Sequence, residues 1–508
     1  MNLRLLTIFF VVLGAIFGTA QPSPNPNPPP TTTAIVHATL VDVRTGKETP
    51  DIVILIRGDK IERVGTSTEV AAPSQAIIVD AARKWVIPGL MDMHAHAGDS
   101  PEVPVNLYLA QGVTTIRSPG GNISLLRLLR ENIDSGKTIG PRLFFSGPIL
   151  DGNPPVWPDG SFLVDTLERA QSAVNFLADQ GVDFIKVYNN VSEPVLEKII
   201  ETATQRGLIV AGHIPRSMTM TRAVDLGMKS LEHIRVTGRE ILSVEEANQI
   251  DFLPLGRREP LLWEKFDPAS PKFTELIHHL ADKGIYLDPT LTIDEATFVL
   301  DDAAQRSDPN NSALPPEWIE FEESHQSSLY DVPANLKETA RNGFKKRQQF
   351  VGMCSRAGVK IIAGTDGPGL GTLVPGFGLH HELQLLVESG LSPAQALRAA
   401  TLTAAEALGK DKDLGSIEPG KFADLLIIEA DPLADIRNAS KIEVIMKGGK
   451  QYRPADLIKT GKGKVSAKAE THDLTNLVGI EHKLNSCCRR VLSAAAPRLV
   501  QLADKIYF

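Results

Sequence analysis

The chain has 508 residues, a formal net charge of -8 and a pI of about 5.9, with 42% hydrophobic and 22% charged residues. This composition is typical of a globular protein with a large core, and an acidic chain without a basic stripe argues against nucleic acid as a partner. The three cysteines, Cys354, Cys487 and Cys488, are too few for a disulfide framework. We expect Cys354 to be a buried apolar residue of a helix.

The first 31 residues are expected to lie outside the fold. Residues 1–20 combine a positive start, an apolar run from Leu5 to Phe17 and small residues up to Ala20, which is typical of a signal peptide. An uncleaved anchor is the alternative, but the apolar run is short for a membrane span. Residues 21–31 are a Pro-rich linker. We therefore predict an exported protein, periplasmic or secreted, without stable membrane insertion after cleavage.

Residues 32–85 and 409–453 are rich in short β-branched runs separated by turn residues. Examples are DIVILI near the start of the chain and ADLLIIEA near its end. Because these segments flank everything else, we predict one small β-sandwich domain built from both. Parts of residues 454–508 look helical, and we assign that tail no function.

Residues 86–408 alternate between helical stretches and short apolar runs that are typical of buried parallel strands. Two of the predicted strands are WVIPGLMDM and RLFFSG, and six more begin after a glycine that suits a helix C-cap. These glycines are Gly112, Gly181, Gly207, Gly227, Gly284 and Gly358. Eight such strands predict an α/β fold with a (β/α)8 TIM barrel. A doubly wound sheet is the alternative, but no Gly-rich dinucleotide fingerprint is present.

Two insertions interrupt this rhythm, at residues 238–270 and 292–345. Long loops after barrel strands lie at the catalytic mouth, so the insertions are candidates for a lid or for specificity loops. Ordinary surface loops are an equally good interpretation.

Side chains that can bind metal ions stand at the carboxyl ends of four predicted strands. His94 and His96 end the first strand two residues apart, so they face the same side. His213, His233 and Asp366 end the fifth, sixth and eighth strands. Each alone is more often an ordinary polar or turn residue. Together they predict a site for Zn²⁺ or a related divalent metal at the barrel mouth.

Lys186 lies in the predicted fourth strand, within residues 183–188 (DFIKVY). Considered alone, it is best interpreted as a strand-end lysine that reaches solvent or pairs with Asp183. Burial at the mouth would instead lower its pKa and leave a neutral, nucleophilic amine. Addition of CO2 would convert that amine into a carbamate, an anionic ligand that can bridge two cations.

The ordered set of these residues resembles the amidohydrolase superfamily in its binuclear, lysine-carbamate form. The runs VIPGLMDMHAH and LGSIEPGKFADLLIIEADPL resemble the family's first-strand and C-terminal signatures. The resemblance extends over residues 33–453 and is nearest to the imidazolonepropionase-like group. That group includes dipeptidases and hydrolases of N-acyl amino acids.

The resemblance implies two divalent metal ions, with Zn²⁺ the first expectation. His94 and His96 would hold the more buried ion together with Asp366, and His213 and His233 would hold the second. Asp366 would act as general base and then as general acid while a metal-bridging hydroxide attacks the substrate. The implied reaction is hydrolysis of a carbon–nitrogen bond in an amide, a cyclic amide, a dipeptide or an N-acyl amino acid.

Carboxylated Lys186 would bridge the two ions. Deaminase relatives commonly lack the strand-four lysine, so Lys186 argues against a deaminase, whereas a lactonase remains an alternative. A non-catalytic binding protein with this fold is a third hypothesis, which the complete set of ligand-capable residues disfavours.

The substrate pocket is less well defined by the sequence. Dipeptidase relatives often carry a tyrosine shortly after the sixth-strand histidine, and no tyrosine follows His233 here. Arg235 could bind a substrate carboxylate or form a surface salt bridge, and Tyr188 could line the pocket beside Lys186. We expect residues 380–382 (HHE) to support the site or cover a helix rather than to bind metal. The predicted partner is a small-molecule or dipeptide substrate, with a homo-oligomer left open.

Overall fold

The structure is a computed structural model that describes residues 32–98, 103–234, 238–250, 253–324 and 331–461. The predicted signal peptide and Pro-rich linker lie outside these residues and stay predictions, as does most of the C-terminal tail. In the described part of the chain, no helix is long and apolar enough to span a membrane.

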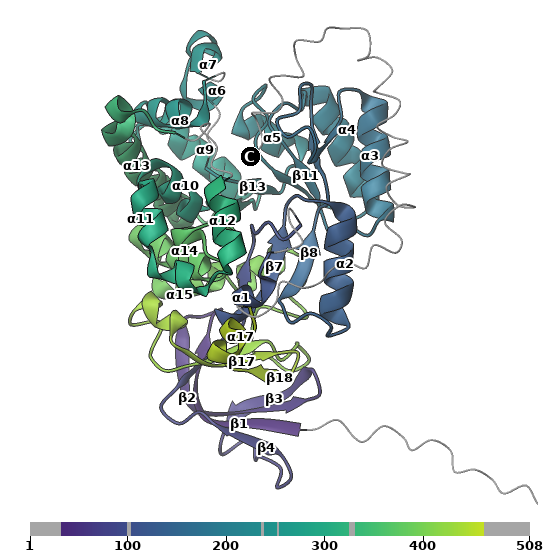
Figure 1. Cartoon of the computed structure of the whole chain (residues 1–508), viewed down its shortest axis with the longest axis vertical. Helices are drawn as coiled ribbons and strands as arrows, with labels where there is room; N and C mark the ends of the chain where they lie inside the picture. Colours follow the sequence, from purple (N-terminus) through teal and green to yellow (C-terminus); the bar gives the residue numbers. More distant parts are fainter. Residues whose placement is uncertain (1–31, 99–102, 235–237, 251–252, 325–330, 462–508) are drawn as a thin grey trace, which may run out of the picture.

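One mixed sheet joins the two ends of the chain and lies below the rest of the molecule in Figure 1. Its strands are β1 (Thr32–Asp42), β2 (Lys47–Arg57), β3 (Lys60–Thr66), β4 (Ile77–Asp80), β5 (Trp85–Pro88), β16 (Leu425–Ile428), β17 (Ile442–Lys447) and β18 (Lys450–Tyr452). Their order is β18-β17-β16-β5-β1-β2-β3, with β4 beside β1. β16 runs antiparallel to β5, with Leu425 opposite Pro88, so segments from both ends share one sheet.

Strand β2 shows why the predicted β runs are continuously apolar. Ile52, Ile54 and Ile56 pack on one side with residues of the strands from the other end of the chain. Val53 and Leu55 pack on the opposite side, in a second apolar cluster. A strand buried on both faces has no polar positions to alternate with.

The parallel strands form the upper part of the molecule. One sheet contains β6 (Leu90–Asp92), β7 (Val113–Ser118) and β8 (Arg142–Phe145). The other has the order β10-β9-β11-β12-β13-β14-β15. Its strands are β9 (Ile149–Asp151), β10 (Ser161–Leu163), β11 (Ile185–Val187), β12 (Val210–Gly212), β13 (Ser230–Glu232), β14 (Tyr286–Asp288) and β15 (Lys360–Ile361).

Backbone hydrogen bonds connect these two parallel sheets on both sides. Next to β8 and β11, the Asp183 amide donates to the Phe145 carbonyl at 2.9 Å. Next to β6 and β15, the Met93 amide donates to the Ala363 carbonyl, also at 2.9 Å. The carboxyl ends of strands far apart in the sequence are thereby brought to one region.

Helices alternate with the parallel strands, as the sequence predicts. They include α1 (Val105–Ala110), α2 (Ile123–Asp134), α3 (Leu167–Asp179), α4 (Glu193–Gln205), α5 (Met220–Leu226), α9 (Pro271–Asp282) and α13 (Lys337–Arg356). All six junction glycines have positive φ, from 63° at Gly284 to 121° at Gly227. Glycine adopts this conformation without the Cβ penalty, so each helix can end abruptly before the next strand.

The predicted first strand, WVIPGLMDM, is not one element. It divides at Gly89 into β5, which belongs to the mixed sheet, and β6, which belongs to a parallel sheet. A Cβ at Gly89 would lie 2.3 Å from Oγ1 of Thr114. The position where the chain passes from one sheet to the other therefore has no room for a side chain. Periodicity alone cannot detect this division, because both halves are apolar.

The two insertions are largely helical. The first contains α6 (Gly238–Ile241), α7 (Val244–Ile250) and α8 (Leu255–Glu264), and the second contains α10 (Leu291–Phe298), α11 (Asp302–Ser307), η1 (Pro309–Ala313), α12 (Pro316–Ser324) and η3 (Ala334–Leu336). Trp263 and Trp318 are 0% and 5% exposed, so both insertions contribute to the apolar core. A role as a lid stays a prediction.

After β15 the chain forms η4 (Gly371–Leu373), α14 (Phe377–Glu388), α15 (Pro393–Ala399) and α16 (Leu402–Ala407), and near its described end η5 (Ile436–Ser440) and α17 (Pro454–Gly461).

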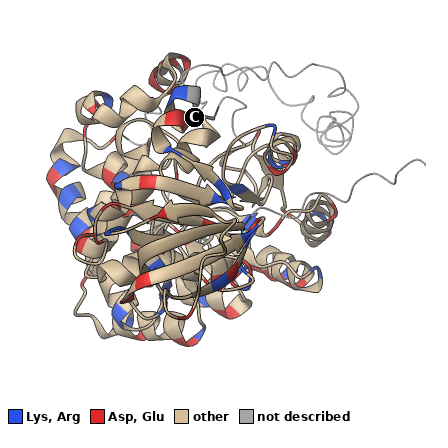
Figure 2. Cartoon of the chain, turned by 90° about the horizontal axis from the view of Figure 1, so that it is seen from below, with Lys and Arg blue, Asp and Glu red and all other residues tan. Residues whose placement is uncertain are grey.

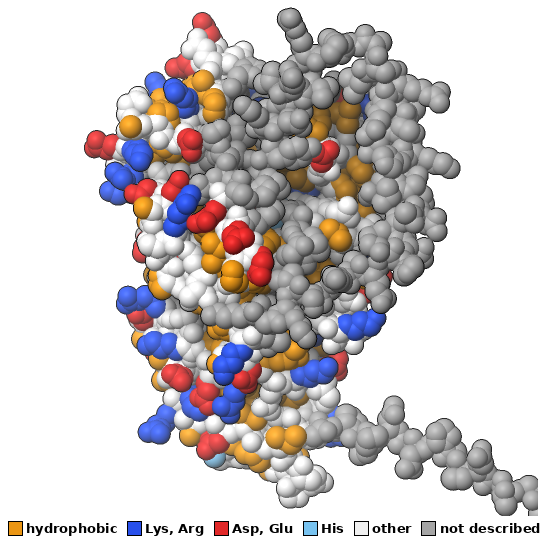
Figure 3. All heavy atoms as spheres, in the orientation of Figure 1, with side chains coloured by type: hydrophobic (Ala, Val, Ile, Leu, Met, Phe, Trp, Pro, Cys, Tyr) orange, Lys and Arg blue, Asp and Glu red, His pale blue; other side chains and the backbone are white. Residues whose placement is uncertain are grey.

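Cys354, in α13, is fully buried, and burial raises the pKa of its thiol. Lys and Arg positions are interspersed with Asp and Glu positions along the ribbon in Figure 2, and their side chains are interspersed on the described surface in Figure 3.

Candidate active site

The first and last parallel strands place His94, His96 and Asp366 side by side. The amides of Thr365 and Asp366 donate to the His94 carbonyl at 3.2 and 2.8 Å, and the His96 amide donates to the Gly367 carbonyl at 2.7 Å. These bonds align the two chain segments beyond β6 and β15. The pair of histidines from one strand therefore faces the aspartate from the other.

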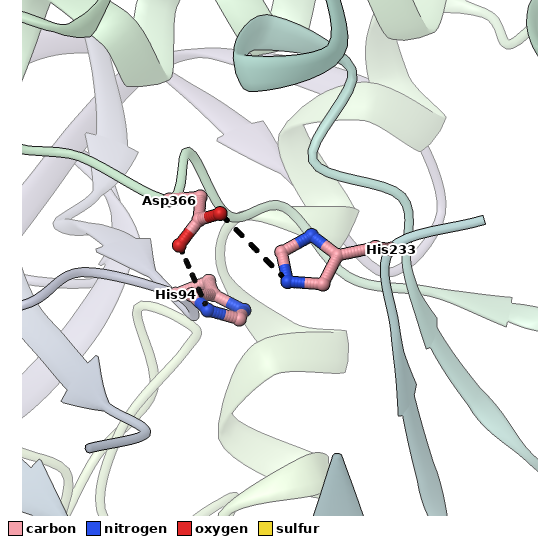
Figure 4. A group of neighbouring side chains, drawn as sticks. All are labelled: His94, His233 and Asp366. Carbon is pink, nitrogen blue, oxygen red and sulfur yellow. Dashed lines mark ion pairs between the residues drawn. The ribbon is translucent and has the colours of Figure 1, made fainter. Parts of the chain in front are cut away.

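The Asp366 carboxylate lies among three imidazoles. Its Oδ1 is 3.2 Å from Nε2 of His94 and 3.0 Å from Nε2 of His96, and its Oδ2 is 3.8 Å from Nε2 of His233. Figure 4 shows the His94 and His233 rings on either side of the carboxylate. Burial alone would raise the pKa of Asp366, but His94 and His233 hold it well below its ordinary value. The group is therefore ionised near neutral pH.

His233 and His213 follow β13 and β12 on the same side of the site. Their ring centroids are 4.7 Å apart. Nδ1 of His233 is hydrogen-bonded to Oγ1 of Thr290 at 2.7 Å, and Nδ1 of His213 to Oδ1 of Asn189 at 2.9 Å. A partner at one ring nitrogen orients the other, which is the arrangement that metal-binding histidines use.

Lys186 is 2% exposed and points into this region. Its Nζ pairs with Oε2 of Glu232, which is 3.7 Å from Nδ1 of His94. The predicted alternative partner, Asp183, instead accepts from Arg130 at 3.1 Å and from the Phe145 amide at 2.9 Å. Burial lowers the pKa of Lys186, although Glu232 opposes that change.

Three buried charged residues beneath the site were not predicted. Glu232 is 2% exposed, Asp288 is 0% exposed, and Arg117 is 1% exposed. The Nη2 atom of Arg117 lies 2.9 Å from Oε1 of Glu232 and 3.4 Å from Oδ2 of Asp288. A signal was present in the sequence, because each is a charged residue inside or at the end of an apolar strand, as Lys186 is.

The attraction of Lys186, His94 and Arg117 lowers the pKa of Glu232, although burial opposes that change. Burial raises the pKa of Asp288 well above its ordinary range. Under the site, Glu232 therefore contacts both Arg117 and Lys186, and such pairing reduces the cost of burying a charge.

Tyr188 lies at the edge of the site. Its ring centroid is 4.0 Å from that of His213, and its hydroxyl accepts a hydrogen bond from Nε1 of Trp157 at 2.9 Å. Trp157 belongs to the connection between β9 and β10. Two aromatic side chains thus form a wall beside His213. Arg235 lies outside the described residues, so its predicted role stays a prediction.

Residues 380–382 lie in α14. His380 is 7% exposed and its Nε2 is hydrogen-bonded to the Gln111 carbonyl at 2.9 Å. Burial lowers the pKa of His380 to about 4. Nε2 of His381 is 2.5 Å from Oε2 of Glu295 in α10. Glu382 is fully buried beneath the amino end of α10.

The donor set fits a divalent transition metal. One ligand atom each from His94, His233 and Asp366 lies within 4.8 Å of the others. Nδ1 of His94 is buried and makes no hydrogen bond among the described residues, although a ring nitrogen is a strong polar group. Imidazole nitrogens together with a carboxylate suit Zn²⁺ and its neighbours.

Parallel strands that carry imidazoles and a carboxylate at their carboxyl ends are typical of metal-dependent hydrolases. Residues 85–452 match the amidohydrolase family, and the chain belongs to that family. The ochratoxinase of Aspergillus niger is 23% identical over 483 residues, which cover 82% of this chain and 86% of that protein. A 5-methylthioadenosine/S-adenosylhomocysteine deaminase of Thermoanaerobacter pseudethanolicus is 25% identical over 444 residues, covering 80% and 90%.

Solved structures agree with this assignment. The crystal structure of a candidate prolidase from Bifidobacterium longum superposes with a TM-score of 0.62 at 26% identity, over 85% of this chain and 100% of that one. The relatives are hydrolases and deaminases, which supports an enzyme of this family.

Proposed function

We propose that the chain is a metal-dependent hydrolase of carbon–nitrogen bonds that acts on an amide, a cyclic amide, a dipeptide or an N-acyl amino acid. The observation that carries this proposal is the convergence of imidazoles, an ionised carboxylate and a buried lysine at the carboxyl ends of the parallel strands. His94, His96 and His233 surround Asp366, His213 packs against His233, and Lys186 approaches His94 through Glu232.

We further infer that the parallel strands close into a (β/α)8 barrel, with β8 and β9 together making the third strand. The hydrogen bonds from Asp183 to Phe145 and from Met93 to Ala363 support this closure. We also propose that the mixed sheet is the small β-sandwich domain. In a barrel, side chains at the carboxyl ends of the strands share one pocket.

The ligands of two divalent metal ions, most simply Zn²⁺, would be His94, His96, His213, His233, Asp366 and carboxylated Lys186. When bound, such ions lower the pKa of water and polarise a carbonyl. The low pKa of Asp366 keeps its carboxylate ionised, so it can accept a proton from the attacking water. Delivery of that proton to the leaving nitrogen would release the amine and restore the ionised carboxylate.

The proposal is tested by incubating the Zn²⁺-loaded protein, with bicarbonate present, with dipeptides, N-acyl amino acids, cyclic amides and lactones. We expect amine release from at least one amide class and a loss of about 10²–10⁴-fold in Asp366→Asn. A matched control is Asp179→Asn, whose side chain is 66% exposed and pairs with Arg206 rather than with a residue of the site. Full turnover in Asp366→Asn would remove Asp366 from the mechanism.

The same screen separates the alternatives. Turnover of lactones without any amide would support the lactonase alternative, and release of ammonia from aminopurine nucleosides would support a deaminase. Absence of both bound metal and turnover would contradict a metal-dependent enzyme.

A further inference from the structure

The hydroxyl of Thr290 is hydrogen-bonded to a predicted metal ligand rather than to its own helix. Oγ1 of Thr290 lies 2.7 Å from Nδ1 of His233, whose Nε2 faces Asp366. Because the two ring nitrogens lie on opposite sides of the imidazole, the Thr290 contact sets the direction of Nε2. For Nε2 to present a lone pair to a metal ion, Nδ1 must carry the proton and donate a hydrogen bond to Oγ1 of Thr290.

This use of Thr290 leaves the start of α10 without its usual cap. Thr290 is the N-cap residue of α10, but its side chain makes no capping hydrogen bond. Threonine at this position normally accepts a bond from the first amides of the helix. Thr290 is also completely buried and has φ 46° and ψ 49°, a left-handed conformation that is strained for a β-branched residue.

Glu382 supplies the missing cap from another helix. Its Oε1 accepts from the Leu291 amide at 3.0 Å, and its Oε2 accepts from the Thr292 amide at 2.7 Å and from the Thr292 hydroxyl at 2.8 Å. Burial raises the pKa of Glu382 to about 7, and these three donors oppose that rise. A carboxylate at a helix amino terminus is also favoured by the helix dipole.

We propose that Glu382 is a positioning residue for His233. By capping α10 in place of Thr290, Glu382 holds the Thr290 backbone in its left-handed conformation and leaves the Thr290 hydroxyl to orient the imidazole. Glu382 lies on α14, which follows the strand that carries Asp366, so the same chain segment provides Asp366 and orients His233. The consequence for metal binding rests on the proposed function, whereas the orientation of the ring does not.

The test compares Thr290→Val and Glu382→Gln with two controls. Thr290→Ser keeps the hydroxyl, and Thr115→Val removes a buried hydroxyl that has no hydrogen-bond partner among the described residues. The first measurement is the ¹⁵N chemical shifts of the His233 ring in the protein without added metal. The signals that disappear in the His233→Gln variant are assigned to this ring. The second is Zn²⁺ affinity by competition with a chromophoric chelator.

We expect a protonated Nδ1 that is hydrogen-bonded to the hydroxyl of residue 290 in the unsubstituted protein, in Thr290→Ser and in Thr115→Val. Thr290→Val and Glu382→Gln should both populate the other tautomer and bind Zn²⁺ about 10- to 100-fold more weakly. Should Glu382→Gln yield no folded protein, the milder Thr292→Val, which removes one donor to the carboxylate, takes its place.

Unchanged ring shifts in Glu382→Gln would overturn the proposal, as would an equal loss of Zn²⁺ affinity in Thr115→Val. Failure of the unsubstituted protein to bind Zn²⁺ would contradict the proposed function instead. The tautomer measurement would still decide the role of Glu382 in that case.

Discussion

Two groups of buried charged residues in this chain look alike and have different surroundings. The mouth cluster comprises Arg117, Lys186, Glu232 and Asp288. The helix cluster comprises Glu259, Asp294 and Arg347, in which Arg347 lies 2.8 Å from Glu259 and 3.3 Å from Asp294. Every member of both groups is at most 2% exposed.

The difference between the clusters lies in what they touch. The Arg347 guanidinium lies 5.2 Å from the Trp263 ring and 4.6 Å from the Phe298 ring, so the helix cluster is set in an aromatic core between α8, α10 and α13. The mouth cluster approaches His94 through Glu232. Buried charge is therefore by itself a feature of packing, and it indicates chemistry only where imidazoles and carboxylates from several strand ends converge on it.

The largest effect should follow from removing the lysine of the mouth cluster. We expect Lys186→Ala to lose bound metal and activity together, because the predicted bridging ligand and the partner of Glu232 both disappear. Added short carboxylates should restore part of each. Lys421→Met, at another buried lysine that donates to the Leu414 carbonyl at 3.2 Å, is the control and should keep both. Metal retained in Lys186→Ala would refute the ligand assignment.

Matched arginine substitutions compare the two clusters directly. Arg117→Met and Arg347→Met should each lower the free energy of unfolding by about 3–5 kcal/mol, because each removes the arginine that pairs with two buried carboxylates. Only Arg117→Met should also lower the metal content per folded molecule. Denaturant unfolding and elemental analysis provide the two measurements, and equal metal loss in both variants would remove the distinction.

A buried imidazole outside the mouth should affect stability alone. The pKa of His380 is lowered from 6.5 to about 4, so the unfolded chain binds a proton more readily between these values. Stability should therefore fall as pH drops from 6.5 to about 4, by about 3 kcal/mol in all from this residue. His380→Gln should give a shallower dependence; parallel stability curves for both proteins would contradict this explanation.

The smallest effect should come from the aromatic wall. Tyr188→Phe removes the hydrogen bond from Trp157 and keeps the ring against His213. Loss of one neutral hydrogen bond is worth about 0.5–1.5 kcal/mol, so we expect a rise in KM of roughly 2- to 10-fold with kcat nearly unchanged. If Tyr188 instead took part in the chemical step, steady-state kinetics would show a fall in kcat alone.

The sequence predicted local features well because they depend on near neighbours. The junction glycines, the alternation of helices with short apolar strands and the placing of potential ligands at strand ends all follow from residues close together in the chain. The pairing of Lys186 with Glu232 joins residues 46 positions apart, and the contact between Glu382 and Thr292 spans 90. No periodicity or turn rule specifies such partners.

Other features were missed because two interpretations share one pattern. The run around Gly89 is apolar on both sides, so its division between two sheets cannot be read from hydrophobicity. Glu232 and Arg117 resemble strand-end surface charges until the partners that bury them are known. Lys186 also resembles a strand-end surface lysine, and only the histidines and Asp366 at the other strand ends favoured a place at the metal site.

The metal content of the purified protein is the most direct test of the central claim. Elemental analysis of the protein, loaded with Zn²⁺ in the presence of bicarbonate and freed of unbound metal, should give two ions per chain. A content near zero would contradict a metal-dependent active site, and a content of one would contradict the two-ion arrangement that assigns Lys186 its bridging role.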